Sequence, residues 1–374
     1  MRKLTICTLS LLLGASSSLF ASEFFQTNLV SDISGMASVT DPNLKDPWGM
    51  SFSSTSPIWV SDRATGVSTL YNGLTGAPVP LVVAVPPGAP LGPTGQVFAG
   101  GGGFSGNPSF IFDTLGGTVD TWGGGSTATV VDTTAGAQYE GLASANGTLY
   151  AANFGSAGGV NVFNSSYAPE TLSGGFTDPN IPAGYSPFNI QNINGLLYVE
   201  YAKVTTGVPV PLPGGGGFVD VYNTNGDLVQ RLISNGALDA PWGITIAPAG
   251  FGSFGGDLLV GNFGNGEINA FNPTTGAFLG TLSDQNGNPI VNSGLWALDF
   301  GNSSANPNAL YFTAGINMGT DGLFGDIQAV PEPASFTLAV FGVLGLLGYA
   351  WQRRSTLGER ASRAKYIAPP STLT

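Results

Sequence analysis

A short pattern recurs six times along the chain and limits the folds that the chain can adopt. Residues 47–50 (Pro-Trp-Gly-Met) return as residues 241–244 (Pro-Trp-Gly-Ile), and more divergent copies lie at 93–96, 139–142, 187–190 and 295–298. The third positions of the copies are residues 49, 95, 141, 189, 243 and 297, so the spacings are 46, 46, 48, 54 and 54. Such a period indicates one structural unit repeated along the chain.

Each repeat predicts four β-strands. The pattern itself begins the first strand, and a second strand such as 149–153 or 258–262 follows and ends in Asn or Asp. A third strand comes after a Gly, as at 159–164, which is typical of a hairpin turn. A shorter fourth strand is predicted at 231–234 and at 281–284. Four strands in a repeat of this length are typical of a β-propeller blade.

The sixth repeat lacks a fourth strand, because the chain runs from Ile327 directly into a different kind of sequence. Residues 28–32 resemble the other fourth strands and precede the first repeat, so we expect them to complete the sixth blade and cover its edge. We therefore predict an all-β fold over residues 22–328, a six-bladed β-propeller with four-stranded antiparallel blades. Seven blades or a β-sandwich are the alternatives.

The composition agrees with this fold and excludes several classes of site. The chain has 57 Gly and 26 Pro, and only 9% of its residues are charged, which argues against an all-helical protein. It has no His, and Cys7 is its one cysteine. Zinc fingers, iron–sulfur clusters and nucleophile–His triads are therefore excluded.

The N-terminus has the three-part layout of a secretory signal peptide. Arg2 and Lys3 precede an apolar stretch at 4–13, and small residues follow up to Ala21. We expect a signal peptidase to cleave after Ala21, so that residues 1–21 and Cys7 are removed. A transmembrane anchor is a weaker interpretation, because the apolar stretch is too short to cross a bilayer.

The C-terminal region predicts a single membrane crossing. Residues 334–351 carry no charge, and a helix of that length spans about 27 Å at ~1.5 Å per residue, close to the thickness of the hydrocarbon layer. Arg353 and Arg354 follow and place the basic tail, residues 355–374, in the cytoplasm by the positive-inside rule. A buried core helix is the alternative.

Residues 329–354 resemble the PEP-CTERM sorting signal of Gram-negative bacteria that produce exopolysaccharide. The resemblance is carried by Pro331, Glu332 and Pro333, the apolar segment, and Arg353 with Arg354. It implies recognition by an exosortase, a transient anchor in the inner membrane, cleavage near the Pro-Glu-Pro motif, and release to the cell surface or exterior. The chain departs from the usual pattern, because such signals end a few residues after the basic pair.

The repeated body resembles an uncharacterised propeller family of PEP-CTERM proteins and, more distantly, the NHL-type propellers. The Pro-Trp-Gly repeats and second strands such as residues 149–154 carry this resemblance. It implies the fold and an extracellular location and supplies no catalytic residue. Between residues 22 and 330 the chain has 21 Asp and Glu against four Lys and Arg, which argues against binding to nucleic acid.

The first strands of a propeller line its central channel, so a site is expected next to the repeated Gly. At the position held by Trp48, Trp242 and Trp296, the third repeat has Glu140. Glu140 together with Gln96 and Asn189 would offer oxygen ligands to Ca²⁺. The alternative for Glu140 is a hydrogen-bonded acid that faces the channel. No catalytic residue and no other cofactor are predicted.

These observations lead to two functional hypotheses. The first is an exported surface or matrix protein that acts as a non-enzymatic binding or scaffold module, with exopolysaccharide or a cell-surface protein as partner. The alternative is a calcium-assisted hydrolase, similar to the propeller lactonases, with its site in the channel.

Overall fold

The computed structural model describes residues 24–155, 158–205, 208–209, 216–330, 342–349 and 351. The chain divides into two units, Met1–Ala329 and Val330–Thr374. All described strands belong to the first unit, and the described residues of the second unit beyond Val330 are helical. No helix within the described ranges is long and apolar enough to cross a membrane. The predicted signal peptide, Pro331–Pro333, Arg353 and Arg354, and about half of the predicted membrane helix lie outside the described residues.

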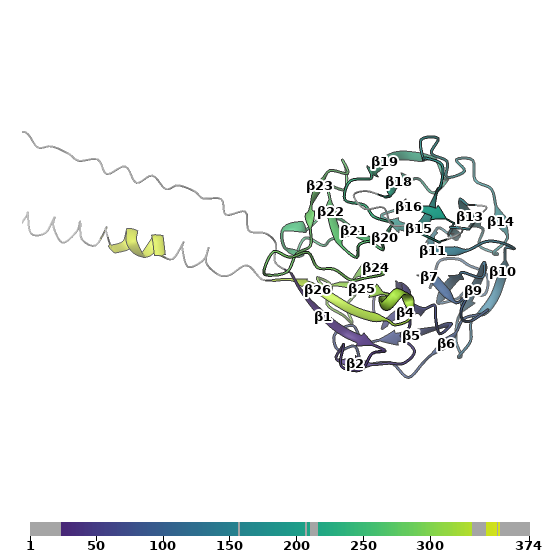
Figure 1. The fold of residues 1–374 in the computed structure, drawn as a ribbon, viewed down its shortest axis with the longest axis horizontal. Helices are drawn as coiled ribbons and strands as arrows, with labels where there is room; N and C mark the ends of the chain where they lie inside the picture. The colour runs from purple at the N-terminus through teal and green to yellow at the C-terminus, as the bar shows by residue number, and fades with distance from the viewer. Residues whose placement is uncertain are drawn as a thin grey trace, which may run out of the picture. The chain divides into compact units, whose positions relative to one another are not determined.

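The described strands form six sheets arranged in a ring, which confirms the predicted six-bladed β-propeller (Figure 1). From the innermost strand outward, blade 1 consists of β3 (Pro47–Ser51), β4 (Ile58–Asp62), β5 (Val67–Tyr71) and β6 (Val83–Ala84). Blade 2 consists of β7 (Pro93–Phe98), β8 (Phe110–Thr114), β9 (Thr118–Trp122) and β10 (Thr129–Thr133). Blade 3 consists of β11 (Tyr139–Ala145), β12 (Thr148–Asn153), β13 (Val160–Phe163) and β14 (Pro169–Glu170). Blade 4 consists of β15 (Tyr185–Ile193), β16 (Leu196–Thr205), β18 (Phe218–Tyr222) and β19 (Leu228–Ser234). Blade 5 consists of β20 (Pro241–Ile246), β21 (Leu258–Asn262), β22 (Ile268–Phe271) and β23 (Phe278–Thr281). A short strand, β17 (Val208–Pro209), pairs with β16, and a 3₁₀ turn, η1, spans Gly252–Phe254.

Blade 6 closes the ring with strands from both ends of the propeller. It consists of β24 (Leu295–Phe300), β25 (Leu310–Ala314), β26 (Leu323–Ala329) and β1 (Phe24–Ser31), with β2 (Val39–Thr40) at its outer edge and the short helix α1 (Ile316–Gly319) between β25 and β26. β1 pairs antiparallel with β26, from Phe24 opposite Ala329 to Ser31 opposite Leu323. The predicted closing strand is therefore confirmed.

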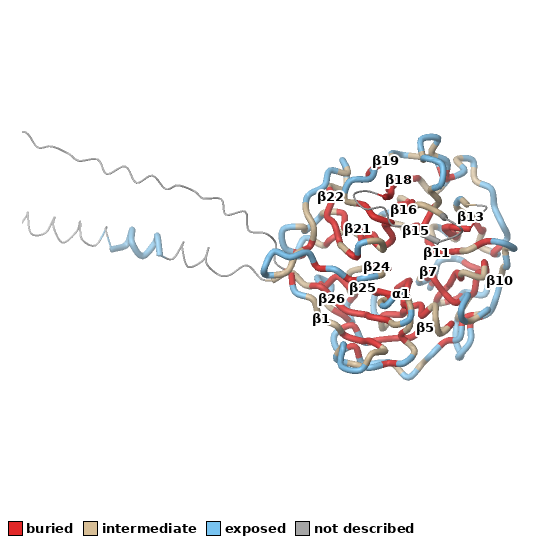
Figure 2. Tube along the Cα trace, in the orientation of Figure 1, coloured by how far each residue is buried: buried red, intermediate tan, exposed pale blue. Residues whose placement is uncertain are grey.

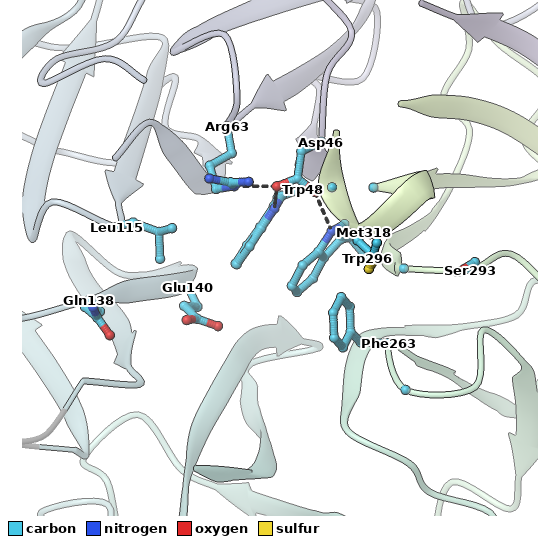
Figure 3. A pocket seen from close by; sticks show the side chains of 14 residues that line it. Asp46, Trp48, Arg63, Leu115, Gln138, Glu140, Phe263, Ser293, Trp296 and Met318 are labelled. Carbon is cyan, nitrogen blue, oxygen red and sulfur yellow. Dashed lines mark hydrogen bonds and ion pairs between the residues drawn. The ribbon is translucent and has the colours of Figure 1, made fainter. Parts of the chain in front are cut away.

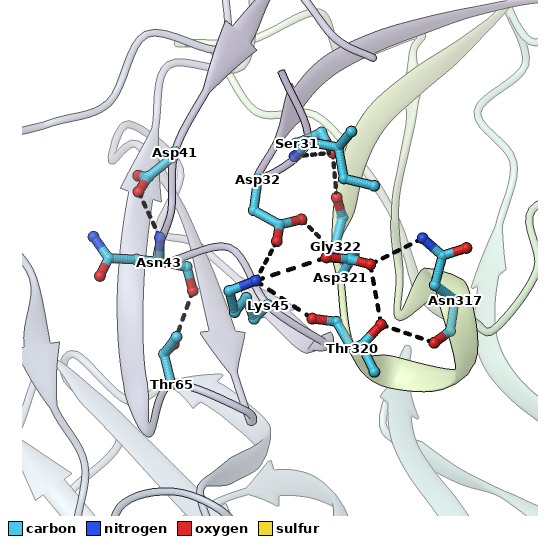
Figure 4. A network of polar contacts seen from close by, with 11 residues as sticks. Ser31, Asp32, Asp41, Asn43, Lys45, Thr65, Asn317, Thr320, Asp321 and Gly322 are labelled. Atoms are coloured by element: carbon cyan, nitrogen blue, oxygen red, sulfur yellow. Dashed lines mark hydrogen bonds and ion pairs between the residues drawn. The ribbon is translucent and has the colours of Figure 1, made fainter. Parts of the chain in front are cut away.

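A polar network holds this closure where blades 6 and 1 meet (Figure 4). Lys45 Nζ lies 2.5 Å from Asp32 Oδ2 and 3.7 Å from Asp321 Oδ1. The second oxygen of Asp32 accepts a hydrogen bond of 2.8 Å from the main-chain N–H of Gly322. One cation thus joins the end of the closing strand to the loop that contains α1.

The repeated Gly allows the innermost strands of neighbouring blades to approach each other closely. A Cβ atom on Gly49 would lie 2.3 Å from the main-chain oxygen of Thr94 in the next blade, and one on Gly243 would lie 2.4 Å from that of Trp296. Neither distance leaves room for a side chain, so Gly is required at both positions.

All six innermost strands shift register at the repeated pattern. In blade 3 the shift falls between Tyr139 and Gly141, so Glu140 is the extra, unpaired residue of a β-bulge. Trp242 occupies the same place in blade 5. Because a bulge redirects the side chain of its extra residue, the pattern aims these side chains at the centre of the ring.

Apolar side chains fill the centre of the ring and the spaces between blades. Buried residues follow the inner strands, whereas the outer strands and loops are largely exposed (Figure 2). The central cluster includes Trp48, Phe188, Trp242 and Trp296, so aromatic rings occupy much of the channel. The space for a ligand therefore lies at the ends of the channel.

Candidate functional site

A cavity of ≈ 540 Å³ lies at one end of the channel, and we call it the large cavity (Figure 3). Its walls come from the first strands and from loops that begin where second strands end. Arg63 follows β4, Leu115 follows β8, Phe263 follows β21, and Met318 belongs to α1. The large cavity thus collects side chains from five of the blades at one face of the ring.

One wall of the large cavity is aromatic. The rings of Trp48 and Trp296 stack with centroids 3.6 Å apart at 21°, and Phe263 lies 4.4 Å from Trp296. Trp242 packs edge-on against Trp296 at 5.7 Å, and its Nε1 donates a hydrogen bond to the main-chain oxygen of Glu140. This wall is therefore rigid and offers an apolar surface to a ligand.

Asp46 neutralises the charge of Arg63 and orients the tryptophan wall. Its Oδ2 forms an ion pair with Arg63 Nε and accepts a hydrogen bond of 2.9 Å from Trp48 Nε1. Its Oδ1 accepts a longer bond of 3.4 Å from Trp296 Nε1. Arg63 also donates from Nη1 to the main-chain oxygen of Pro90. Both oxygens of Asp46 are thus used within the protein.

Glu140 points into the large cavity from β11 and is only 2% exposed (Figure 3). Its Oε2 has no hydrogen-bond partner. Burial raises the pKa of Glu140 well above its ordinary value, and the nearby Asp113 raises it further, whereas Arg63 opposes the shift. This shift favours the protonated carboxyl group, which can both donate and accept a hydrogen bond.

The three residues predicted to bind calcium do not line the same cavity. Glu140 lines the large cavity, whereas Gln96 and Asn189 line a separate one of ≈ 20 Å³. The amide of Gln96 donates to the main-chain oxygens of Trp59 and Gly49, and that of Asn189 donates to the oxygen of Trp242. Within the described part of the chain, no three His, Cys, Asp or Glu side chains are grouped to hold a metal. Calcium ligation stays a prediction.

Sequence reasoning did not identify Asp46, Arg63, Phe263 and Met318 as residues of the site. Arg63 could have been identified as a candidate from the sequence, because it is one of only four basic residues between positions 22 and 330. The other three stand outside the six repeated patterns, so their positions carried no comparable signal.

Comparison with known proteins bears on the sorting signal and on the fold. Residues 329–354 match the PEP-CTERM protein-sorting motif. This match supports the predicted signal and implies export, a transient membrane anchor and processing by an exosortase.

The fold is similar to two solved structures. One is a catalytically inactive variant of virginiamycin B lyase from Staphylococcus aureus with quinupristin (12% identity, TM-score 0.51, covering 83% of this chain and 100% of that one). The other is a protein of unknown function from Bacteroides thetaiotaomicron (11% identity, TM-score 0.52, covering 82% of this chain and 77% of that one). At these identities the likeness shows the fold alone.

Two viral proteins are more similar in sequence. The uncharacterized protein R648 of Acanthamoeba polyphaga mimivirus is 33% identical over 325 residues, which cover 80% of this chain and 78% of that protein. The uncharacterized protein L690 of the same virus is 32% identical over 332 residues, which cover 80% of this chain and 84% of that protein. The chain therefore belongs to the family of these two uncharacterized mimivirus proteins.

Proposed function

We propose that this is an exported, surface-sorted binding protein whose propeller holds a ligand in the large cavity without transforming it. The observation that carries the proposal is a cavity of ≈ 540 Å³ with an aromatic wall and one buried carboxyl group that lacks a partner on one oxygen. Small-molecule sites are of this size, are mostly apolar, and contain a few polar groups that orient the ligand. The absence of His from the chain supports binding over proton-transfer catalysis.

A cavity-blocking variant tests the location of the site. Ser293 is exposed and lines the large cavity, so Ser293→Trp should fill the cavity while leaving the core unchanged. The matched control is Ser126→Trp, because Ser126 is exposed on the loop between β9 and β10. We expect a ligand found by screening the exported protein on glycan and peptide arrays to be lost in Ser293→Trp and retained in Ser126→Trp. Equal binding by both variants would refute the proposed site.

Recovery of the ligand separates binding from the hydrolase alternative. A binding module should return the bound compound unchanged after prolonged incubation, with or without calcium. Product formation that depends on calcium and is lost in Glu140→Gln would instead support the calcium-assisted hydrolase.

A further inference from the structure

The charged groups of the large cavity leave no charge for a ligand to neutralise. Arg63 is paired with Asp46, and both oxygens of Asp46 are engaged by Arg63, Trp48 and Trp296. An anionic ligand would therefore meet no free cation, and a cationic ligand would meet no free carboxylate unless Glu140 became ionised. A buried charge without a partner is strongly unfavourable, so the cavity selects against both kinds of ligand.

The unused polar groups lie together at the edge of blade 3. Glu140 lines the cavity and its Oε2 is buried without a hydrogen-bond partner, and Gln138, two residues earlier, also lines the cavity (Figure 3). Within the described residues, the Gln138 side chain has no hydrogen-bond partner. A neutral carboxyl and an amide each offer donors and acceptors. Trp48, Trp296 and Phe263 form the apolar wall on another side of the same cavity.

We propose that the large cavity binds an uncharged sugar ring, whose hydroxyl groups bond to Glu140 and Gln138 while its apolar face lies against the aromatic wall. The inference rests on the proposed function and specifies its ligand class. A purely apolar ring would leave the buried carboxyl of Glu140 unpaired, whereas a hydroxyl-bearing ring satisfies it. A sugar ring combines an apolar face with a polar edge, as the cavity does.

Matched sugars test the charge argument directly. Glucose, glucuronate and glucosamine share one ring and differ in charge at about pH 6. Galactose, galacturonate and galactosamine form a second set. We expect a neutral hexose to quench the tryptophan fluorescence of the exported protein in a saturable manner, with charged counterparts binding at least about tenfold more weakly. Equal or tighter binding of a charged counterpart, or no saturable binding of either neutral hexose, would overturn the proposal.

Variants at Glu140 test how it acts. Glu140→Gln keeps the shape and the donor and acceptor, so it should bind the neutral hexose within about threefold of wild type. Glu140→Leu removes both the donor and the acceptor and should lower the affinity for the neutral hexose at least about tenfold. If Glu140→Leu fails to fold, Gln138→Leu replaces it, because Gln138 is only partly buried and should tolerate the change. Loss of binding in Glu140→Gln, or full binding in the Leu variant, would contradict the assigned role.

The blocking variant separates failure of this inference from failure of the proposed function. If a charged ligand binds wild type and is lost in Ser293→Trp, the cavity is the site and the ligand class is wrong. If a neutral hexose binds Ser293→Trp as tightly as wild type, the large cavity is not the site, and both proposals fail.

Discussion

Buried carboxyl groups without basic partners should make the stability of this protein depend on pH. Asp113 is completely buried and accepts hydrogen bonds from Thr94 and from the main-chain N–H of Gly95. Burial nevertheless raises the pKa of Asp113 from 3.8 to about 7. The folded protein then holds this proton more tightly than the unfolded chain, so the contribution of Asp113 to stability is greatest below about pH 4 and is lost as the pH rises to about 7. The loss reaches about 1.4 kcal/mol per pH unit for one such group.

Asp113→Asn should remove part of this pH dependence. Asn153 and Asn262 end the second strands of blades 3 and 5. Asn153 accepts a hydrogen bond from the main-chain N–H of Gln138, and Asn262 accepts one from that of Asp239. Asn at position 113 therefore keeps the acceptor and cannot ionise. Urea unfolding at pH 5 and pH 8 should show a smaller difference for the variant than for wild type. An unchanged difference would show that Asp113 does not titrate in this range.

Met318 sits in a strained conformation at the rim of the large cavity. Its φ is 59°, that of Asn317 is 52°, and its side chain is 99% exposed. A left-handed conformation costs a residue other than Gly about 1–2 kcal/mol, so Met318→Gly should stabilise the fold by about 1 kcal/mol. The same change removes an apolar contact at the rim and should weaken ligand binding. Thermal melts and fluorescence titrations test the two effects, and Met36→Gly, at an exposed residue without positive φ, should give neither.

Calcium ligation by Glu140, Gln96 and Asn189 also has a direct test. An ion held only by the folded protein raises the melting temperature, by an amount that corresponds to about 2.7 kcal/mol at a hundredfold excess over its dissociation constant. Glu140→Gln should abolish that increase. Identical melts of the wild type in calcium and in EDTA would contradict calcium binding.

At the scale of elements, the repeated strands were predictable and the outer strands were less so. Every innermost strand coincides with a copy of the repeated pattern, because all six shift register there and four of the six have Gly where neighbouring strands approach closely. Several outer strands are short and exposed, so they leave little sequence pattern. β6 and β14 have two residues each, and β23 ends at Thr281, where 281–284 was predicted. Beyond that end, Asp284 accepts bonds from the N–H groups of Asn286 and Asn288 in a turn.

The candidate site was predictable only in part, for a reason of geometry. Glu140 stood out because an acid replaces tryptophan at its position in the repeat. Gln96 and Asn189 were grouped with Glu140 because they lie two residues and one residue after the equivalent position of their own repeats. An extended strand, however, advances about 3.3 Å per residue through the thickness of the ring. Residues one or two positions further therefore face another cavity. Asp46 and Arg63 lie in two loops outside the repeated patterns, so the repeats do not predict their ion pair.

The closing strand β1 should contribute to the stability of the whole ring. Phe24 is fully buried and packs against Phe251 and Phe254 of blade 5, whereas its neighbour Phe25 is 38% exposed. Phe24→Ala should lower the free energy of unfolding by about 3–5 kcal/mol, and Phe25→Ala should change it by less than about 0.5 kcal/mol. Deletion of residues 22–34 should destabilise all blades in one transition. Equal stabilities of the two alanine variants would refute this role for β1.

At the scale of the whole molecule, the sorting motif predicts that the exported form is shorter than the translated chain. An exosortase that cleaves near Pro331–Pro333 would release the propeller and leave the apolar segment and the basic tail behind. Replacing residues 331–333 with Ala should keep the protein in the inner membrane, because an uncharged segment of 18 residues, 334–351, is long enough to serve as an anchor. A control with Ala at residues 371–373, at the end of the tail, should be released normally. Cell fractionation and the intact mass of the extracellular protein measure both effects. Extracellular wild-type protein that still carries residues 355–374 would contradict cleavage at the motif, and normal release of the 331–333 variant would show that another sequence directs sorting.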